Sequence, residues 1–431
     1  MSNRKLFGTD GVRGIAGDYP LDEAGCIKIG KAIAAHFAKK PGSKVVIAWD
    51  PRESSETLVS NVVNGLTSES VDVVKVGVIP TPGLAYITRE NDFAAGVMIT
   101  ASHNPVEYNG IKVFDEKGDK LDDNTEAAIN QLIDSSIPDQ EIGKILSEPN
   151  LKQQYIDFVK NSVDGVLDQK VVIDCANGAS SETTNEIFKS ILPNLTIIND
   201  QPNGQNINKN CGATDTESLK ELVVSQKYNL GIAFDGDADR IILIDSRGNE
   251  LNGDYILYML AKSLNVDGIV TTVMSNIGLD KALYESKVKV KRVSVGDRYV
   301  LEGMKETGYL LGGEQAGHII LGDLLKTGDG TLTAAQIIQG ILKTNKSLDK
   351  WHDELVLYPQ ALINIPLKNK DILESQQIKD YISIENSALD GRGRLLIRPS
   401  GTEPLARVMV ESEDAKERCE RIANKLKELS A

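Results

Sequence analysis

Hydrophobic and polar positions follow two alternating patterns over most of this chain. Short apolar runs, typical of buried strands, are separated by segments whose apolar residues fall on one helical face. The expected strands cover residues 44–48, 71–76, 95–99, 111–114, 170–174, 195–198, 230–234, 268–273 and 288–295. The expected helices cover residues 21–37, 55–67, 124–135, 182–192, 217–226, 254–264 and 279–286. This alternation predicts mostly parallel sheets covered by helices.

Two segments depart from this pattern. Residues 141–163 read as a polar helical connection, and the chain from about residue 369 reads as a helix, two strands and a final helix. A chain of 431 residues is also too long for one compact core. We therefore predict three similar α/β domains with mixed or parallel sheets (1–153, 154–252 and 253–366) and a smaller C-terminal α+β domain (367–431).

Composition excludes several classes of protein. The net charge of -14 argues against a general nucleic-acid surface, so any anion must be met by local clusters of arginine and lysine. The four cysteines lie far apart without a CxxC pair, which indicates neither a zinc site nor a disulfide framework. The sequence shows no signal peptide and no apolar run that could span a bilayer, so we expect a cytoplasmic protein without a membrane partner.

The first candidate site follows the apolar strand at residues 95–99. Pro105 can continue neither a helix nor a central strand, and Asn109-Gly110 is a second turn signal. Ser102 therefore lies on a tight loop beyond a strand end, where open α/β sheets usually carry their chemistry. Ser102 could be a phosphate-carrying nucleophile, with His103 and Lys112 transferring protons. The alternative is a hydrophilic hairpin.

The second candidate is an acidic loop, Phe234-Asp-Gly-Asp-Ala-Asp-Arg240, at the end of another apolar strand. Alternation places Asp235, Asp237 and Asp239 on one side of the segment, where their repulsion is costly unless a cation lies among them. Carboxylate oxygens favour Mg²⁺. An acidic surface turn is the alternative. A calcium loop is the other alternative, although the glutamate expected at its twelfth position is missing.

The serine segment also carries a resemblance. Thr100-Ala-Ser-His-Asn-Pro105, followed by Tyr108-Asn-Gly-Ile-Lys112, closely resembles the phosphoserine signature of the α-D-phosphohexomutases. Gly8-Thr-Asp-Gly-Val-Arg-Gly14 resembles the start of that family, whose arginine reaches the active serine, here Arg13. The resemblance also implies that the acidic loop holds Mg²⁺ beside phosphorylated Ser102 and that Arg240 contacts the phosphate.

Two further segments resemble substrate-binding loops of the family. Gly312-Gly-Glu-Gln-Ala-Gly-His318 resembles its sugar-reading loop, which implies sugar contacts from Glu314, Gln315 and His318, with Ala316 where relatives have serine. Ile397 to Pro404 resembles its phosphate clamp, and the residues implied there are Arg398, Ser400, Gly401 and Thr402. Without the resemblance, plain turns would explain both segments equally well.

Three features resemble the phosphoglucosamine branch of the family: Gln315, residues 327–330, and residues 295–299. The last of these implies substrate contacts from Gly296, Asp297 and Arg298. The resemblance implies four domains around a central cleft, each contributing one loop. It also implies transfer of a phosphoryl group between positions 6 and 1 of glucosamine phosphate through phosphorylated Ser102 and a 1,6-bisphosphate.

In this reading Lys112 is the general acid/base, His103 assists it, and Arg13 and Arg240 hold the phosphate. Each chain would bind one Mg²⁺, through Asp235, Asp237, Asp239 and Ser102, and a bisphosphate would be the activator. The partner is a hexosamine phosphate, without nucleic acid, and the protein is a monomer or homodimer. The alternatives are a phosphomannomutase/phosphoglucomutase, a phosphatase with Asp235 as nucleophile, and a non-catalytic sugar-phosphate sensor.

Overall fold

The computed structural model describes residues 6–8, 11–38, 40, 42–133, 135, 142–367, 370–389, 391–399 and 405–429. The chain divides into two compact units. The first comprises Met1–Met274 and Val288–Asp353, and the second comprises Ser275–Lys287 and Glu354–Ala431. Each unit is described by itself below.

The N-terminal domain of the first unit contains a six-stranded sheet in the order β1-β5-β4-β2-β3-β6. Its strands are β1 (Val12–Ile15), β2 (Lys44–Trp49), β3 (Asp72–Val78), β4 (Ala95–Ile99), β5 (Tyr108–Phe114) and β6 (Ile145–Leu146). Its helices are α1 (Glu23–Phe37), α2 (Ser55–Thr67), α3 (Thr81–Glu90) and α4 (Asp123–Ile133), and α5 (Leu151–Lys160) leads to the next domain.

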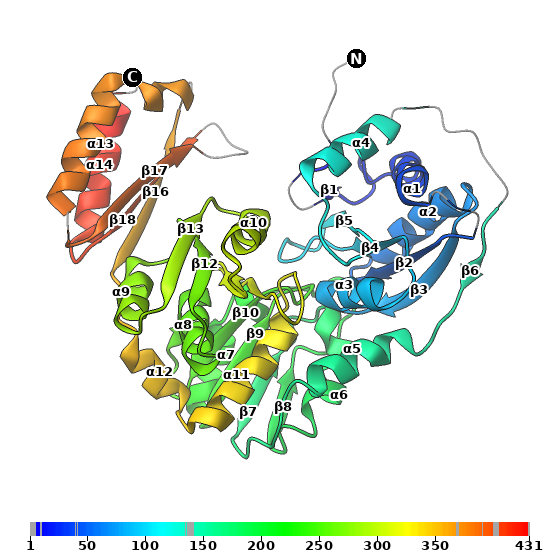
Figure 1. The fold of residues 1–431 in the computed structure, drawn as a ribbon, viewed down its shortest axis with the longest axis horizontal. Coiled ribbons are helices and arrows are strands. Elements are labelled where there is room, and N and C mark those ends of the chain that lie inside the picture. The colour runs from blue at the N-terminus through cyan, green and yellow to red at the C-terminus, as the bar shows by residue number, and fades with distance from the viewer. Residues whose placement is uncertain are drawn as a thin grey trace. The chain divides into compact units, whose positions relative to one another are not determined.

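Alternating apolar residues let helices cover both faces of this sheet. Val45, Ile47 and Val97 join one core with apolar residues of α1, α2 and α4. The residues between them in the strands point to the opposite face, because side chains alternate along a strand. There a Cβ atom added to Gly96 would lie 2.2 Å from Thr88 of α3, so α3 packs directly on that face. Figure 1 shows these layers.

The next two domains contain smaller sheets, in the orders β11-β10-β9-β7-β8 and β13-β12-β14-β15. The second domain contains β7 (Val171–Asp174), α6 (Thr184–Phe188), β8 (Leu195–Ile198), α7 (Glu217–Ser225), β9 (Leu230–Phe234), β10 (Ile241–Asp245) and β11 (Glu250–Leu251). The third contains α8 (Gly253–Ser263), β12 (Gly268–Thr272), β13 (Lys289–Val293), α10 (Asp297–Thr307), β14 (Leu311–Gly313), β15 (Ile319–Leu321), α11 (Gly330–Thr344) and α12 (Leu348–Glu354).

One strand arrangement occurs in all three sheets. The orders β3-β2-β4-β5, β8-β7-β9-β10 and β13-β12-β14-β15 are equivalent, with three parallel strands followed by an antiparallel fourth. The turn from the third strand to the fourth carries Ser102 in the first sheet, Asp235 to Asp239 in the second and Glu314 to His318 in the third. The predicted mixed or parallel α/β architecture and its repetition are therefore confirmed.

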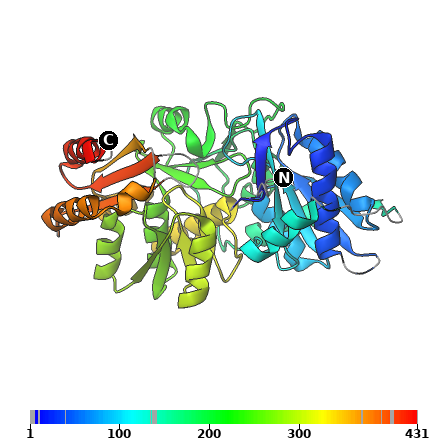
Figure 2. The ribbon, with the colours of Figure 1, turned by 90° about the horizontal axis from the view of Figure 1, so that it is seen from above.

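The second unit contains a three-stranded antiparallel sheet in the order β16-β18-β17, and Figure 2 shows its helices beside the sheet. Its elements are α9 (Ile277–Glu285), β16 (Gln360–Pro366), α13 (Gln376–Leu389), β17 (Arg394–Pro399), β18 (Leu405–Glu411) and α14 (Ala415–Leu429). Ala406, Val408 and Val410 alternate along β18 and form a core with apolar residues of α13 and α14, such as Ile378 and Ile422. The predicted small α+β domain is thus present.

The prediction of a polar helical connection over residues 141–163 was right only over α5 (Leu151–Lys160). Its described part contains a short strand, β6, before α5 begins at Leu151. The sequence analysis also missed α3, α10, α11 and the hairpin strands β10 and β15. The two strands are short apolar runs beside loops, which do not distinguish helix from strand. Within the described residues, no helix is long and apolar enough to cross a membrane.

Candidate active site

Ser102 lies just beyond the end of β4 in a constrained loop. Its backbone is left-handed (φ 53°), its N–H donates to Thr100 Oγ1 at 2.9 Å, and the residue is 1% exposed. The Ser102 hydroxyl donates to Asp235 Oδ2 at 2.8 Å. The serine and the acidic loop, which are far apart in the sequence, therefore meet directly.

A buried arginine that the sequence analysis did not single out holds this loop. Arg52 donates from Nη2 to the carbonyls of Ser102 and Asn104, both at 2.9 Å. Its Nη1 donates to the carbonyls of Pro105 and Tyr108. Arg52 belongs to the Asp50-Pro-Arg52 turn, which follows the end of β2, the strand beside β4 in the sheet. Its position just beyond a strand end was the sequence feature that could have identified it.

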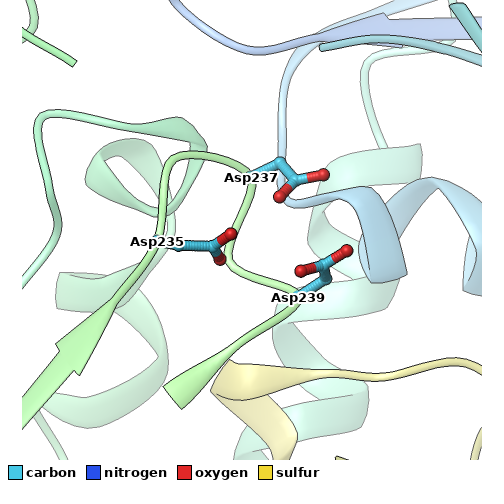
Figure 3. A group of neighbouring side chains, drawn as sticks. All are labelled: Asp235, Asp237 and Asp239. Carbon is cyan, nitrogen blue, oxygen red and sulfur yellow. The ribbon is translucent and has the colours of Figure 1, made fainter. Parts of the chain in front are cut away.

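The three aspartates of the acidic loop converge, as predicted. One carboxylate oxygen from each of Asp235, Asp237 and Asp239 lies within 4.8 Å of the others, and all three residues are buried (Figure 3). Ala238 adopts a left-handed conformation (φ 56°), so the segment is a tight turn and not an extended strand. The small residues between the aspartates permit that turn.

Burial and mutual repulsion give these carboxyls unequal proton affinities. Burial, and then the charges of Asp239 and Asp237, raise the pKa of Asp235 to about 8. Burial also disfavours the charged form of Asp239, but Lys112 and His318 outweigh this effect and lower its pKa well below the usual range. Lys112 Nζ donates to Asp237 Oδ2 at 2.8 Å and to Asp239 Oδ2 at 3.2 Å.

The cluster fits a hard divalent cation. Among the described residues, neither Asp237 Oδ1 nor Asp239 Oδ1 has a hydrogen-bond partner, although both atoms are buried. A buried carboxylate oxygen without a hydrogen bond is costly, and a cation would remove that cost. Three oxygen donors together suit Mg²⁺, which fills its remaining positions with water or phosphate oxygens.

Close backbone approach joins the acidic loop to the serine domain. A Cβ atom added to Gly236 would lie 2.5 Å from the Ser102 carbonyl oxygen, so only glycine fits there. Thr81, at the start of α3, donates from its N–H to the Asp237 carbonyl and from Oγ1 to Asp237 Oδ2 at 2.6 Å. The two loops are therefore held in fixed register.

Basic side chains surround Ser102. Arg13 Nη1 donates to the Ala101 carbonyl at 2.9 Å, and His103 Nδ1 lies 3.3 Å from Ser102 Oγ. Burial, Arg240 and Arg13 lower the pKa of His103 to about 4, so its imidazole is neutral near pH 7. The Arg240 N–H donates to Asp235 Oδ1, and its buried Nε has no hydrogen-bond partner within the described chain.

The sugar-loop candidates lie between β14 and β15. Glu314 Oε1 accepts from the Gly296 N–H at 3.1 Å, Gln315 Nε2 donates to Asp254 Oδ2 at 3.1 Å, and Ala316 is exposed. His318 is buried, with Nδ1 3.7 Å from Asp239 Oδ1. Burial opposes its charged form, but Asp239 outweighs burial and raises the His318 pKa.

Residues 327–330 contact both the sugar loop (residues 312–318) and the acidic loop (residues 234–240). A Cβ atom added to Gly328 would lie 2.3 Å from the His318 ring, and one added to Gly330 would lie 2.5 Å from the Arg240 carbonyl oxygen. The Gly330 N–H donates to the Ala238 carbonyl at 3.0 Å. This segment, noted in the sequence only as a family likeness, lets the sugar loop and the acidic loop pack closely.

Asp297 and Arg298 point in different directions from the start of α10. Asp297 Oδ2 lies 3.5 Å from His318 Nε2 and is also paired with Lys120. Arg298 donates instead to Asp123 Oδ1 and to the Leu121 carbonyl, each at 2.6 Å.

The second unit carries two arginines directly opposite each other. Arg398 of β17 pairs in register with Arg407 of β18. Ala406 and Val408 face the helix core, so Arg407, between them, faces away from it. Burial and Arg407 lower the pKa of Arg398, whose Nε has no hydrogen bond within the described residues. The sequence analysis missed Arg407. Ser400, Gly401 and Thr402 lie outside the described residues.

Comparison with family models gives one result along the whole chain. Four models of phosphoglucomutase/phosphomannomutase match: alpha/beta/alpha domain I at residues 4–139, domain II at 153–248, domain III at 252–358 and the C-terminal domain at 362–429.

Similar proteins extend over the same length. A phosphoglucosamine mutase of Deinococcus deserti is 42% identical over 97% of this chain and 96% of its own. One of Clostridium botulinum (strain Hall) is 46% identical over 96% of each chain.

Solved structures share the fold. A phosphoglucomutase/phosphomannomutase family protein of Burkholderia thailandensis has a TM-score of 0.85 at 22% identity, covering 100% of this chain and 97% of its own. An N-acetylphosphoglucosamine mutase of Aspergillus fumigatus, in complex with GlcNAc-6P and magnesium, has a TM-score of 0.70 at 17% identity, covering 100% and 97%.

Proposed function

Because this chain belongs to the phosphoglucomutase/phosphomannomutase family, we propose that it is an isomerase that interconverts glucosamine 6-phosphate and glucosamine 1-phosphate. The observation that carries this assignment is the 42–46% identity to phosphoglucosamine mutases over nearly the whole chain. The contact between Ser102 Oγ and Asp235 Oδ2 is the geometry that a phosphoserine beside a cation site requires.

In the proposed reaction, phosphorylated Ser102 gives its phosphoryl group to the free hydroxyl of the hexosamine phosphate. The bond from Ser102 Oγ to phosphorus breaks, a bond from the sugar oxygen to phosphorus forms, and the proton of the sugar hydroxyl ends on Ser102 Oγ. The product is a 1,6-bisphosphate, which turns over in the site and returns its other phosphoryl group to Ser102. Free bisphosphate would act as activator by phosphorylating Ser102 in enzyme that has lost the group.

The residues around Ser102 take roles that follow from their positions. Lys112 is the proposed general acid/base, because its ammonium group lies at the cluster that adjoins the serine. His103, neutral near pH 7 and with Nδ1 3.3 Å from Ser102 Oγ, is placed to assist proton transfer at the serine. Arg13 and Arg240 hold the phosphate, and Arg240 Nε, which makes no hydrogen bond within the described residues, is a donor for it.

One Mg²⁺ per chain is the proposed cofactor, held by Asp235, Asp237, Asp239 and an oxygen on Ser102. When bound, it would neutralise charge on the phosphoryl group during transfer. We further propose that Glu314, Gln315 and His318 contact the sugar, and that Arg398, Ser400, Gly401 and Thr402 hold the distal phosphate. We also propose that the protein has the domain limits given above, is cytoplasmic, and is a monomer or homodimer.

The test combines mass spectrometry with kinetics. Purified protein should carry one phosphate on the peptide containing Ser102, and Ser102→Ala should lose both this phosphate and nearly all mutase activity. Phosphate on Asp235, with Ser102→Ala still active, would indicate the aspartyl phosphatase instead. Rates with glucosamine, glucose and mannose 6-phosphates test the substrate, since a preference for glucose or mannose phosphate would favour a phosphoglucomutase or phosphomannomutase.

A further inference from the structure

Arg298 joins two domains that each carry part of the candidate active site. It is the second residue of α10 in the third domain, and its side chain reaches the segment from Leu121 to Glu126 of the first domain. Arg298 Nη1 donates to Asp123 Oδ1 and Nη2 donates to the Leu121 carbonyl, each at 2.6 Å. Glu126 Oε1, in a buried side chain, lies 3.7 Å from Nη2.

Neighbouring charges connect the same two segments. Lys120 of the first domain pairs with Asp297, the residue before Arg298. Lys305, two turns further along α10, lies 3.8 Å from Asp119 Oδ2. Residues 297–305 of α10 therefore meet residues 119–126 through a set of complementary charges.

This charged contact adjoins the sugar loop. Asp297 Oδ2 lies 3.5 Å from His318 Nε2, and the Arg298 N–H donates to Asp297 Oδ1 at 2.8 Å. Lys120, Asp297, Arg298 and His318 line one small cavity of about 70 Å³. A displacement of α10 and its domain from the first domain would therefore move Asp297 and His318 together relative to Ser102.

We propose that Arg298 is a positioning residue that fixes the third domain to the first and so places His318 relative to Ser102. The resemblance assigns Arg298 to substrate. An arginine holds a phosphate through two parallel N–H donors, however, and both terminal nitrogens of Arg298 already bond to the first domain. The two neighbouring residues therefore have different roles. Asp297 orients His318, whereas Arg298 holds the start of α10 against the first domain.

A direct test measures the distance between the two domains without any substrate. Spin labels on Lys28→Cys in α1 and Lys289→Cys in β13 would report this distance by pulsed EPR, because both lysines are exposed and all four native cysteines are buried. We expect one narrow distribution in the parent protein, a broadened one in Arg298→Ala, and partial recovery in Arg298→Lys. Glu306→Ala, on the same helix but paired with Lys291 inside the third domain, should match the parent.

Kinetics provide the second arm, and this arm alone rests on the proposed mutase function. Arg298→Ala should lower kcat/KM about tenfold, and Asp123→Ala a few-fold, because Asp123 is 73% exposed and its ion pair is screened. The double variant should be no worse than Arg298→Ala, since both changes break the same contact.

Two results would overturn the inference. Arg298→Ala could raise KM with an unchanged distance distribution, which would make Arg298 a sugar-phosphate ligand. Alternatively, the effects of Arg298→Ala and Asp123→Ala could multiply, which would mean that they act separately. A protein without mutase activity whose distance distribution still broadened would keep the inference and lose only the proposed function.

Discussion

Asp50 and Arg52 form a fully buried ion pair beneath the Ser102 loop, with Arg52 Nε 2.9 Å from Asp50 Oδ2 and neither side chain exposed. Asp50 also accepts hydrogen bonds from Thr100 Oγ1 at 2.7 Å and Ser55 Oγ at 3.0 Å. The pair therefore satisfies polar groups on both sides of the strand end from which Ser102 projects. Removing either partner would leave an uncompensated buried charge, which is strongly destabilising.

The first prediction concerns Arg52. Arg52→Lys keeps the charge but lacks the planar donors that reach four loop carbonyls, so transfer from Ser102 should slow at least tenfold while the protein stays folded. Arg52→Ala should lower the free energy of unfolding by about 3–5 kcal/mol. Urea denaturation and phosphorylation of Ser102 by bisphosphate measure the two effects. Arg247→Lys, at an exposed arginine among carboxylates, is the control, and an Arg52→Lys protein with parental rates would contradict the role.

The second prediction links Mg²⁺ binding to proton release. With a pKa of about 8, Asp235 is mostly protonated at pH 7 in metal-free protein and must lose its proton to become a ligand. Mg²⁺ should therefore release close to one proton at pH 7 and far fewer at pH 9.5, and chelation should stop turnover. Calorimetry in two buffers of different ionisation enthalpy measures the release. Tight binding without buffer dependence at pH 7 would exclude Asp235 as the titrating ligand.

A third prediction concerns the glycine beneath the sugar-loop histidine. In Gly328→Ala the new methyl group must displace the His318 ring, because its nearest ring atoms would lie 2.3 Å away. KM for glucosamine 6-phosphate should rise at least several-fold, with a smaller change in the first phosphoryl transfer. Gly340→Ala in α11, where the nearest atom is the Ser263 hydroxyl oxygen at 3.1 Å, is the control. An unchanged KM in Gly328→Ala would show that the His318 position does not affect sugar binding.

The paired arginines of the second unit give a fourth prediction. Like charges directly opposite on neighbouring strands repel, so Arg407→Ala should raise the stability of ligand-free protein by about 0.2–1 kcal/mol. If both arginines bind the distal phosphate, Arg398→Ala and Arg407→Ala should each raise KM roughly ten- to a hundredfold. Bisphosphate should also escape, so that activity decays and recovers when bisphosphate is added. Higher stability with an unchanged KM would show that Arg407 does not bind the distal phosphate.

The fifth prediction concerns stability and pH at Asp329, which is buried against the hydroxyl of Tyr155. Burial raises the Asp329 pKa to about 7, so between roughly pH 4 and 7 the folded protein binds more protons at this residue than the unfolded chain. This contribution is complete at low pH and is lost as pH rises through that window, by at most about 1.4 kcal/mol per pH unit. Asp329→Asn should therefore match the parent near pH 4 and exceed its stability at pH 8. Parallel urea titrations of the two proteins would test this, and equal pH slopes would contradict it.

Much of the fold and the site could be predicted because their signals are local. The repeated apolar runs identified most strands, and Ser102 and the acidic loop could be located because each directly follows such a run. The three aspartates were grouped correctly, although the segment is a turn through left-handed Ala238 and not the extended chain from which the alternation was argued. The carboxylates lie together because they occupy alternate positions in a short segment. Their grouping was therefore predicted correctly, even though the expected local conformation was wrong.

Residues whose roles depend on distant partners could not be predicted. Arg52 was not singled out because the carbonyls that it binds lie about fifty residues later, and they meet it only when β2 pairs with β4. Arg407 became a candidate only through its register with Arg398. The sequence by itself determined which groups are available and where strands end, since hydrophobic periodicity and turn residues act over a few positions. Tertiary structure alone decided which groups meet, because strand register and domain packing bring together side chains whose separation along the chain carries no signal.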